Sequence, residues 1–219
     1  MFTGIVQSLV AVMHVEQERD LSRIELDMGE LADGIELGAS VAVNGTCLTV
    51  TRSGGDGRVF FDIIKETLDT TNLGSLELGS LVNVERSFKV GDEVGGHIVS
   101  GHVTATAVLS DLRHDGHDRV LTFALAPEWL RFVLHKGYVG VDGASITVSS
   151  VDRENGTFSI CLIPETIERT TLGRLALGDR VNVEVDSQTQ TIVETIERVM
   201  QDPQMRKAMM SQALAGDVE

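Results

Sequence analysis

Two matched polar positions are the first places where this chain could do chemistry. Cys47 stands in NGTCLTV and Ser145 in DGASITV, and each follows a turn and leads into an apolar strand pattern. A lone cysteine is most often a small buried hydrophobe. The serine at the matching position weakens that interpretation for Cys47, because small polar groups at equivalent places are typical of ligand contacts. Thr49 and Thr147, two residues further on, share the same strand faces.

Histidines are the second group that could move protons near neutral pH. His97 and His102 lie in GGHIVSGHV, where glycines allow a close approach of the backbone. In a strand this odd spacing turns the two rings to opposite faces, so we predict no shared metal ion. Cys161, in the apolar run FSICL, is expected in a core.

Asp186 and Lys136 are isolated charged residues. Asp186 follows the strand pattern VNVEV and precedes a helical pattern, so helix capping explains it as well as proton transfer does. Lys136 lies in HKG, and its counterpart in the first half of the chain is Leu37 or Gly38. The sequence holds no phosphate loop, dinucleotide fingerprint or nucleophile elbow, so it does not indicate those enzyme classes.

The sequence contains an internal repeat. Three segments return 98 or 99 residues later with half or more of their residues identical: 41–50 as 139–148, 64–74 as 163–173, and 78–85 as 177–184. FTGIV at residues 2–6 has a weaker echo in VSGHV at 99–103. A repeat this long predicts a complete small domain with its own core in each copy. Unlike matched residues, such as Ile5 and His102, suggest one ligand type bound twice and handled in two roles.

Length, net charge and cysteine content limit the kinds of partner that this chain could bind. The 219 residues fit two domains of about 100 residues plus a tail. A net charge of −15 argues against nucleic acid, whose phosphates need Lys and Arg. The N-terminal apolar stretch is broken by Gln7, Ser8 and His14, so we predict neither a signal peptide nor a membrane partner. Two cysteines, one per copy, fit a reducing cytoplasm.

Short Val- and Ile-rich runs between glycine turns predict strands. In the first copy these runs are Ile5–Val12, Arg23–Asp27, Ser40–Val43, Cys47–Thr51, Val59–Ile63 and Val82–Val84. About six short strands per hundred residues predict a small closed barrel, since closure removes unpaired edges, and the fold class is all-β. Short helices are expected at Leu31–Gly34, Glu66–Asn72, Pro127–His135 and Glu165–Thr171. We place the domain boundary near Gly91–Gly96.

The C-terminal tail has a helical pattern, unlike the strand patterns of the two copies. Ser187 and Gln190 resemble a capping box, and Pro203 would end or kink the helix that follows. The apolar residues of that helix recur at helical spacing: Ile192, Val193, Ile196, Val199 and Met200. This stripe predicts a helix that either docks on its own barrel or mediates self-association.

The motifs MFTGIV, NGTCLTV, VNVERS, GGHIVSGHV, DGASITV and VNVEVD, in this order, resemble those of the riboflavin synthase alpha-chain family. The resemblance implies two tandem six-stranded Greek-key β-barrels, each binding a lumazine, and a C-terminal α-helix that assembles a homotrimer. Accordingly we place an N-terminal barrel at 1–96, a C-terminal barrel at 97–186, and the trimerisation helix and tail at 187–219. The implied reaction transfers a four-carbon unit between two 6,7-dimethyl-8-ribityllumazine molecules, giving riboflavin and 5-amino-6-(D-ribitylamino)uracil, with no cofactor or metal.

By motif match, the resemblance also implies which residues line the two pockets. The first would use Gly4, Ile5, Val6, Cys47, Leu48, Thr49, Asp62, Ile63, Ile64, Lys65, Glu66 and Thr67. The second would use Gly101, His102, Val103, Lys136, Ser145, Ile146, Thr147, Ile163, Pro164, Glu165, Thr166, Ile167 and Glu168. For proton handling or water activation we expect His102, Ser145 and Asp186, with Cys47 assisting in the other barrel. The working site would lie between the N-terminal barrel of one subunit and the C-terminal barrel of its neighbour.

A non-catalytic lumazine- or flavin-binding carrier or antenna protein of the same fold is the alternative. Such relatives lose polar site residues in the second barrel, whereas His102, Ser145 and Thr147 are all present here. The flavin barrel of an oxidoreductase fits less well, because no nicotinamide-binding domain follows the barrels.

Overall fold

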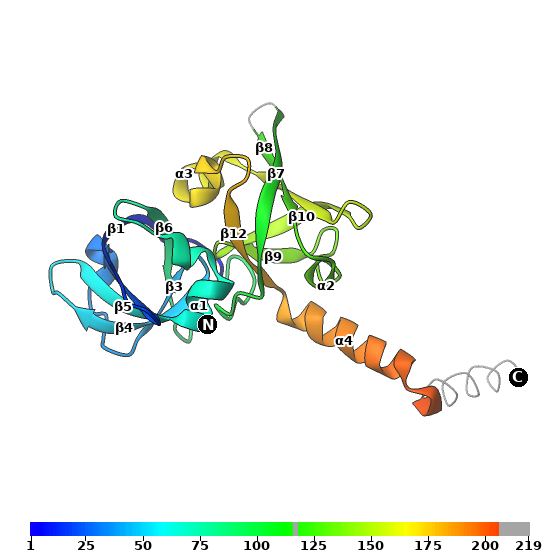
Figure 1. Cartoon of the computed structure of the whole chain (residues 1–219), viewed down its shortest axis with the longest axis horizontal. Coiled ribbons are helices and arrows are strands. Elements are labelled where there is room, and N and C mark those ends of the chain that lie inside the picture. Colours follow the sequence, from blue (N-terminus) through cyan, green and yellow to red (C-terminus); the bar gives the residue numbers. More distant parts are fainter. Residues whose placement is uncertain (116–117, 206–219) are drawn as a thin grey trace, which may run out of the picture. The chain divides into compact units, whose positions relative to one another are not determined.

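The computed structural model describes residues 1–115 and 118–205 (Figure 1). Residues 1–185 form one compact unit, and a second unit begins at Asp186. The first unit contains two closed antiparallel β-barrels, one from each copy of the repeat. The prediction of two six-stranded barrels is therefore confirmed.

The first barrel is a Greek key. Its strands are β1 (Ser8–Gln17), β2 (Leu21–Asp27), β3 (Ser40–Val43), β4 (Thr46–Ser53), β5 (Arg58–Ile64) and β6 (Leu81–Arg86). Around the barrel they run β1-β2-β5-β4-β3-β6. The chain passes from β2 to the hairpin-connected strands β3, β4 and β5, and β5 returns beside β2. On β5, Val59, Phe61 and Ile63 are buried while Asp62 is exposed, and this alternation builds the core on one face.

The second barrel repeats this plan. Its strands are β7 (Ala105–Asp115), β8 (Asp118–Ala124), β9 (Tyr138–Val141), β10 (Ala144–Asp152), β11 (Thr157–Leu162) and β12 (Arg180–Val185). Even the bulges match: the register shifts between Val12 and His14 in β1, and between Leu109 and Asp111 in β7. Each position in one barrel thus has a structural counterpart in the other.

Short helices follow the strands that lead into the candidate pockets. α1 (Lys65–Thr70) and α3 (Pro164–Arg169) confirm two predicted helices, each starting one residue earlier than expected. The predicted helix at Leu31–Gly34 is a 3₁₀ helix at Gly29–Ala32. α2 (Pro127–Leu130) ends well before His135. Its Leu130 carbonyl accepts hydrogen bonds from the Val133 N–H, three residues on, and from the guanidinium of Arg153.

The second unit contains α4 (Ser187–Gln201), which ends before Pro203 as predicted. Its N-cap is Asp186 rather than the predicted Ser187, so the expected capping box is wrong. The Asp186 carboxylate accepts hydrogen bonds from the Gln188 and Thr189 N–H groups and from the Thr189 hydroxyl. Among the described residues, no helix is long and apolar enough to cross a membrane.

The two barrels contact each other through equivalent turns. The Asn83 side-chain amide donates to the Asp142 carbonyl at 2.8 Å, and that of Asn182 donates to the Asn44 carbonyl at 2.8 Å. All four residues are buried. Because the contact is reciprocal, the barrels are related by an approximate twofold axis.

Candidate functional site

The segments that precede β1 and β7 are exchanged between the barrels. The Ser145 N–H, on β10, donates to the Gly4 carbonyl at 2.7 Å. The Cys47 N–H, on β4, donates to the Gly101 carbonyl at 2.8 Å. The predicted grouping of Gly4, Ile5 and Val6 with Cys47 is therefore wrong, and so is that of Gly101, His102 and Val103 with Ser145. The exchange also explains why β1 starts at Ser8 instead of Ile5.

Glycine is required at both crossing points. Gly4 has a φ of +74°, and a Cβ there would lie 2.5 Å from the Ser145 Cβ. Gly101 has a φ of +84°, and a Cβ there would lie 2.6 Å from the Cys47 Cβ. The left-handed conformation and the close backbone approach both exclude a larger residue. A pair of hydrogen bonds between Phe2 and Val99 joins the exchanged segments to each other.

Two buried carboxylates hold the exchanged segments. Glu85 accepts hydrogen bonds from the Thr3 N–H and hydroxyl and from the Gly4 N–H. Glu184 does the same for Ser100 and Gly101. Burial raises the pKa of both carboxyls above the ordinary value, and the hydrogen bonds oppose that rise.

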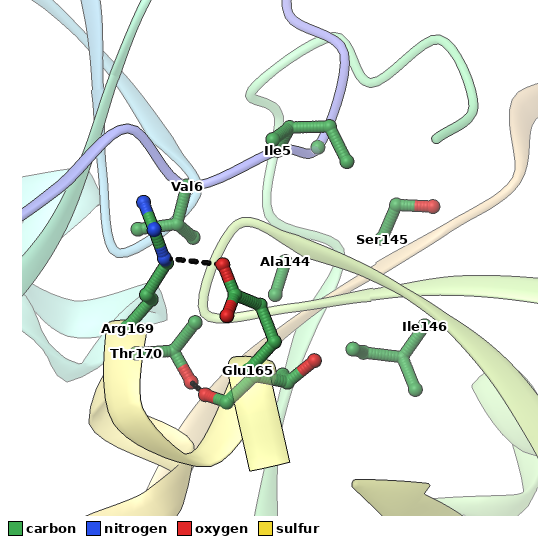
Figure 2. A pocket seen from close by; sticks show the side chains of 10 residues that line it. Ile5, Val6, Ala144, Ser145, Ile146, Glu165, Arg169 and Thr170 are labelled. Carbon is green, nitrogen blue, oxygen red and sulfur yellow. Dashed lines mark hydrogen bonds and ion pairs between the residues drawn. The ribbon is translucent and has the colours of Figure 1, made fainter. Parts of the chain in front are cut away.

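A pocket of about 210 Å³ opens at the second barrel (Figure 2). Backbone and side chains of Gly4, Ile5 and Val6 form one wall, and Ala144–Ile146 with α3 form the rest. On α3, the side chains of Glu165 and Arg169 form an ion pair at the pocket. All six predicted residues after β11 are exposed or half-buried: Ile163, Pro164, Glu165, Thr166, Ile167 and Glu168.

A histidine that was not among the predicted site residues contacts a residue of the pocket wall. His97 Nδ1 and Ser145 Oγ share a hydrogen bond of 2.6 Å. The His97 ring stacks on Tyr138 with centroids 5.3 Å apart. A hydroxyl paired with an imidazole in this way can exchange a proton through it.

His97 was missed because residues 97–102 were treated as a strand. The segment is irregular, with a single bridge at Val99, so strand periodicity does not orient its rings. Gly96 is the sequence feature from which the contact between His97 and Ser145 could have been predicted. A Cβ on Gly96 would lie 2.4 Å from the Thr3 carbonyl oxygen and 2.7 Å from the Ser145 Cβ, so only glycine lets the chain pass there.

At the equivalent position in the first barrel, Cys47 lies beside the exchanged segment in which Gly101 precedes His102. Cys47 is half-buried on β4, Thr49 is exposed two residues on, and His102 is exposed beside Gly101. Leu48 and Ile63 are core residues, so only their backbones can face a ligand. The remaining predicted residues lie at the end of β5 and on α1: Asp62, Ile64, Lys65, Glu66 and Thr67.

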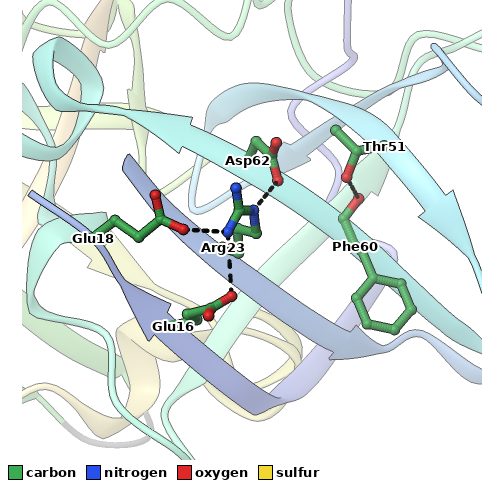
Figure 3. A network of polar contacts seen from close by, with 6 residues as sticks. All are labelled: Glu16, Glu18, Arg23, Thr51, Phe60 and Asp62. Carbon is green, nitrogen blue, oxygen red and sulfur yellow. Dashed lines mark hydrogen bonds and ion pairs between the residues drawn. The ribbon is translucent and has the colours of Figure 1, made fainter. Parts of the chain in front are cut away.

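Two of these first-barrel residues already have ionic partners. Asp62 lies 3.7 Å from Arg23, which also contacts Glu16 and Glu18 (Figure 3). Lys65 pairs with Asp69 at 2.7 Å along α1. In the second barrel the ion pair on α3, Glu165 with Arg169, lies one position further along its helix and has the opposite order of charge. The two sites therefore differ in electrostatics as well as in their polar side chains.

Lys136 occupies a strained position. Its φ is 63°, and its N–H donates to the Val148 carbonyl, as the N–H of Gly38 donates to that of Val50. Gly38 is therefore its counterpart. A lysine in the left-handed region costs about 1–2 kcal/mol relative to ordinary backbone. The backbone conformation therefore does not explain why a lysine stands at this position.

The structure also places two other residues of the sequence analysis, Cys161 and Asp186. Cys161 is exposed, so its predicted core position is wrong; its counterpart Asp62 is exposed as well. Asp186 caps α4 and belongs to the second unit. Among residues 1–115 and 118–205, no group of three or more His, Cys, Asp or Glu side chains could hold a metal ion.

Comparison with known proteins gives a consistent result. A family model described as the lumazine binding domain matches residues 3–87 and 100–186. The riboflavin synthase of Escherichia coli (strain K12) is 46% identical over 202 residues, covering 91% of this chain and 93% of that protein. The riboflavin synthase of Mycobacterium tuberculosis (strain H37Rv) is 41% identical over 201 residues, covering 91% of this chain and 98% of that protein.

Solved structures of LumP are also similar. The complex of LumP with 6,7-dimethyl-8-(1'-D-ribityl) lumazine is 26% identical, with a TM-score of 0.75, and covers 84% of this chain and 99% of that chain. The complex of LumP with riboflavin is 26% identical, with a TM-score of 0.77, and covers 85% of this chain and all of that chain.

Proposed function

Because this chain belongs to the riboflavin synthase family of paired lumazine-binding domains, we propose that it transfers a four-carbon unit between two molecules of 6,7-dimethyl-8-ribityllumazine. One molecule becomes riboflavin, and the other becomes 5-amino-6-(D-ribitylamino)uracil. The two substrates supply all the atoms that the products contain, so the proposal includes neither a cofactor nor a metal.

The observation that carries this proposal is the pair of matched sites with unlike side chains. The same backbone frame presents Ser145 with His97 in one barrel and Cys47 with His102 nearby in the other. Two copies of one ligand can therefore bind alike and still be treated differently. A dismutation needs this arrangement, because one molecule donates carbon and the other accepts it.

Proton transfer is the chemistry that the side chains offer. An acidic methyl group on one lumazine must lose a proton, and the resulting carbanion must attack the other lumazine. We assign this proton handling to Ser145 with His97, to His102 and to Cys47, since imidazole, thiol and hydroxyl groups suit transfer near neutral pH. Lys136, strained and exposed, is proposed to contact substrate. Asp186 remains a proposal for water activation alongside its capping role.

We propose that the working site forms between the N-terminal barrel of one subunit and the C-terminal barrel of another in a homotrimer. The apolar stripe on α4 supports assembly, because Ile192 and Ile196 are 59% and 57% exposed in the single chain. On this proposal residues 1–96 and 97–186 are the lumazine-binding domains, and 187–219 serve trimerisation. The use of two cysteines as thiols fits a cytoplasmic enzyme.

A turnover assay tests the proposal directly. Purified protein is incubated with 6,7-dimethyl-8-ribityllumazine alone, and riboflavin is followed by absorbance and chromatography. We expect riboflavin and the ribitylaminouracil in equal amounts. Tight binding without product would instead support the alternative, a non-catalytic lumazine carrier.

A further inference from the structure

We propose that Glu85 and Glu184 are crossed positioning residues, each shaping the lumazine pocket of the barrel to which it does not belong. Glu85 lies on β6 of the first barrel and would position the pocket of the second. Glu184 lies on β12 of the second barrel and would position the pocket of the first. The inference rests on the proposed function for its effect on turnover, but the crossing itself can be tested without turnover.

The first clamp links β6 to the second-barrel pocket. Glu85 is 4% exposed. Its Oε1 accepts from the Thr3 N–H at 2.6 Å and from the Thr3 hydroxyl at 2.7 Å, and its Oε2 accepts from the Gly4 N–H at 3.0 Å. The carbonyl of Gly4 in turn accepts from Ser145. One residue further on, Ile5 lies in the pocket wall.

The second clamp repeats this geometry in the other direction. Glu184 is 8% exposed. Its Oε1 accepts from the Ser100 N–H at 2.7 Å and from the Ser100 hydroxyl at 2.8 Å, and its Oε2 accepts from the Gly101 N–H at 3.0 Å. The carbonyl of Gly101 accepts from Cys47, and His102 follows in the chain. Each carboxylate thus fixes the residue before a side chain that differs between the sites, Ile5 or His102.

A carboxylate fits this role better than any other side chain. Three donors converge on each group, and an ionised carboxylate accepts through both oxygens. A glutamine of the same shape has one oxygen and one NH₂ group. Its NH₂ would face the glycine or the Thr3 or Ser100 donors, leaving a buried N–H opposite another N–H. Glutamate-to-glutamine substitution therefore loosens the segment without changing its volume.

Thiol reactivity can report on each pocket separately. In the full-length protein, alkylation of Cys47 reports on the first-barrel pocket, and exposed Cys161 is the internal reference. Alkylation of the thiol introduced by Ser145→Cys, which copies the residue at the matching position, reports on the second. Rates are measured peptide by peptide with mass spectrometry. Glu77→Gln and Glu154→Gln, which change exposed carboxylates on each barrel, are the matched controls.

The crossing predicts a specific pattern. Glu184→Gln should speed alkylation at Cys47 about fivefold, the effect of losing one hydrogen bond on a local opening equilibrium, and leave the Ser145→Cys site unchanged. Glu85→Gln should do the reverse. The control variants should change neither rate. If Glu85→Gln speeds alkylation at Cys47 and not at the Ser145→Cys site, each carboxylate acts on its own barrel and the proposal is overturned; equal rates in all variants overturn it as well.

Two further variants keep the test valid if a glutamine variant does not fold. Thr3→Val and Ser100→Ala each leave the carboxylate in place. Each removes a hydroxyl that donates to the carboxylate and accepts from the N–H two residues on, that of Ile5 or His102. Thr3→Val should affect only the Ser145→Cys site, and Ser100→Ala only Cys47. If the protein is a riboflavin synthase, both glutamine variants should also lower kcat about tenfold, because misplaced substrates lose alignment. A crossed alkylation pattern with no riboflavin formed by any variant would refute the proposed function and leave the crossing intact.

Discussion

Gly45 and Gly143 lie face to face where the two barrels meet. A Cβ on Gly45 would approach the Gly143 nitrogen to 2.6 Å, and a Cβ on Gly143 would approach the Gly45 nitrogen to 2.7 Å. Both residues have positive φ, 77° and 81°. The reciprocal contact sets how closely the barrels approach, and with it the position of the exchanged segments.

Gly143→Ala should destabilise the protein by about 2–4 kcal/mol, combining the cost of a left-handed alanine with the cost of overpacking. Gly178→Ala is the matched control, because Gly178 has a φ of 92° and open space around it. It should cost only about 1 kcal/mol, from the backbone conformation alone. Urea unfolding of both variants measures the difference. Equal losses would show that the close approach between barrels carries no stability.

The same contact contains an asymmetric pair, Asn44 and Asp142. Both have φ near 45°, and the side-chain oxygen of each accepts a backbone N–H from its own barrel, from Asn83 and Asn182. Burial raises the pKa of Asp142 to about 7, although hydrogen bonds from Asn182, Asn72 and Thr171 oppose the rise.

Asp142 should therefore make stability depend on pH in an unusual direction. Between its unfolded pKa of 3.8 and its folded pKa of about 7, the folded protein keeps the proton and the unfolded chain loses it. Stability from this group falls as pH rises through that window. Asp142→Asn cannot lose a proton, so its stability relative to the parent should rise between pH 5 and pH 8 by on the order of 2 kcal/mol. Urea unfolding at the two pH values checks this, and a pH-independent difference would contradict it.

The side chains assigned to proton transfer should each be needed for turnover. His97→Gln, Ser145→Ala, His102→Gln and Cys47→Ala should each lower kcat, by roughly 10²-fold or more for a group that transfers the proton. His97→Gln and Ser145→Ala should not be additive, because the two residues share one hydrogen bond. His14→Gln, at an exposed position on β1, is the control and should keep full activity. A residue whose replacement leaves kcat near normal has no part in the chemistry.

The fold was predictable because the two copies carry the same local signals. Alternating Val59, Phe61 and Ile63 define a strand, and Asn44-Gly45 adopts the positive φ values that a tight hairpin turn requires. These signals depend on neighbours in sequence. The helix at Pro127 was predicted too long. The chain after Leu130 continues in turns that join residues three apart, such as the hydrogen bond from the Val133 N–H to the Leu130 carbonyl.

The exchange of segments was not predictable in the same way. Because the copies are equivalent, placing Gly4 against Cys47 or against Ser145 satisfies the same pattern of glycine and polar residues. Only tertiary contacts, such as the bridge between Phe2 and Val99, distinguish the two arrangements. The contact between His97 and Ser145 likewise depends on tertiary contacts and not on neighbours in sequence. The exposure of Cys161, in contrast, could have been inferred from its counterpart, an aspartate.

The stripe on α4 gives a final prediction, for assembly. Ile192, Ile196 and Met200 recur along one side of the helix and are each more than half exposed in the single chain. If this stripe holds the proposed trimer together, Ile192→Asp with Ile196→Asp should lower the solution mass from three chains toward one, because charges would be buried without partners. Thr191→Asp adds a charge on the opposite, polar side and should leave the mass unchanged. Light scattering at several concentrations measures both. Because the proposed site needs barrels from two subunits, the doubly substituted protein should also lose turnover, and an active monomer would contradict a site shared between chains.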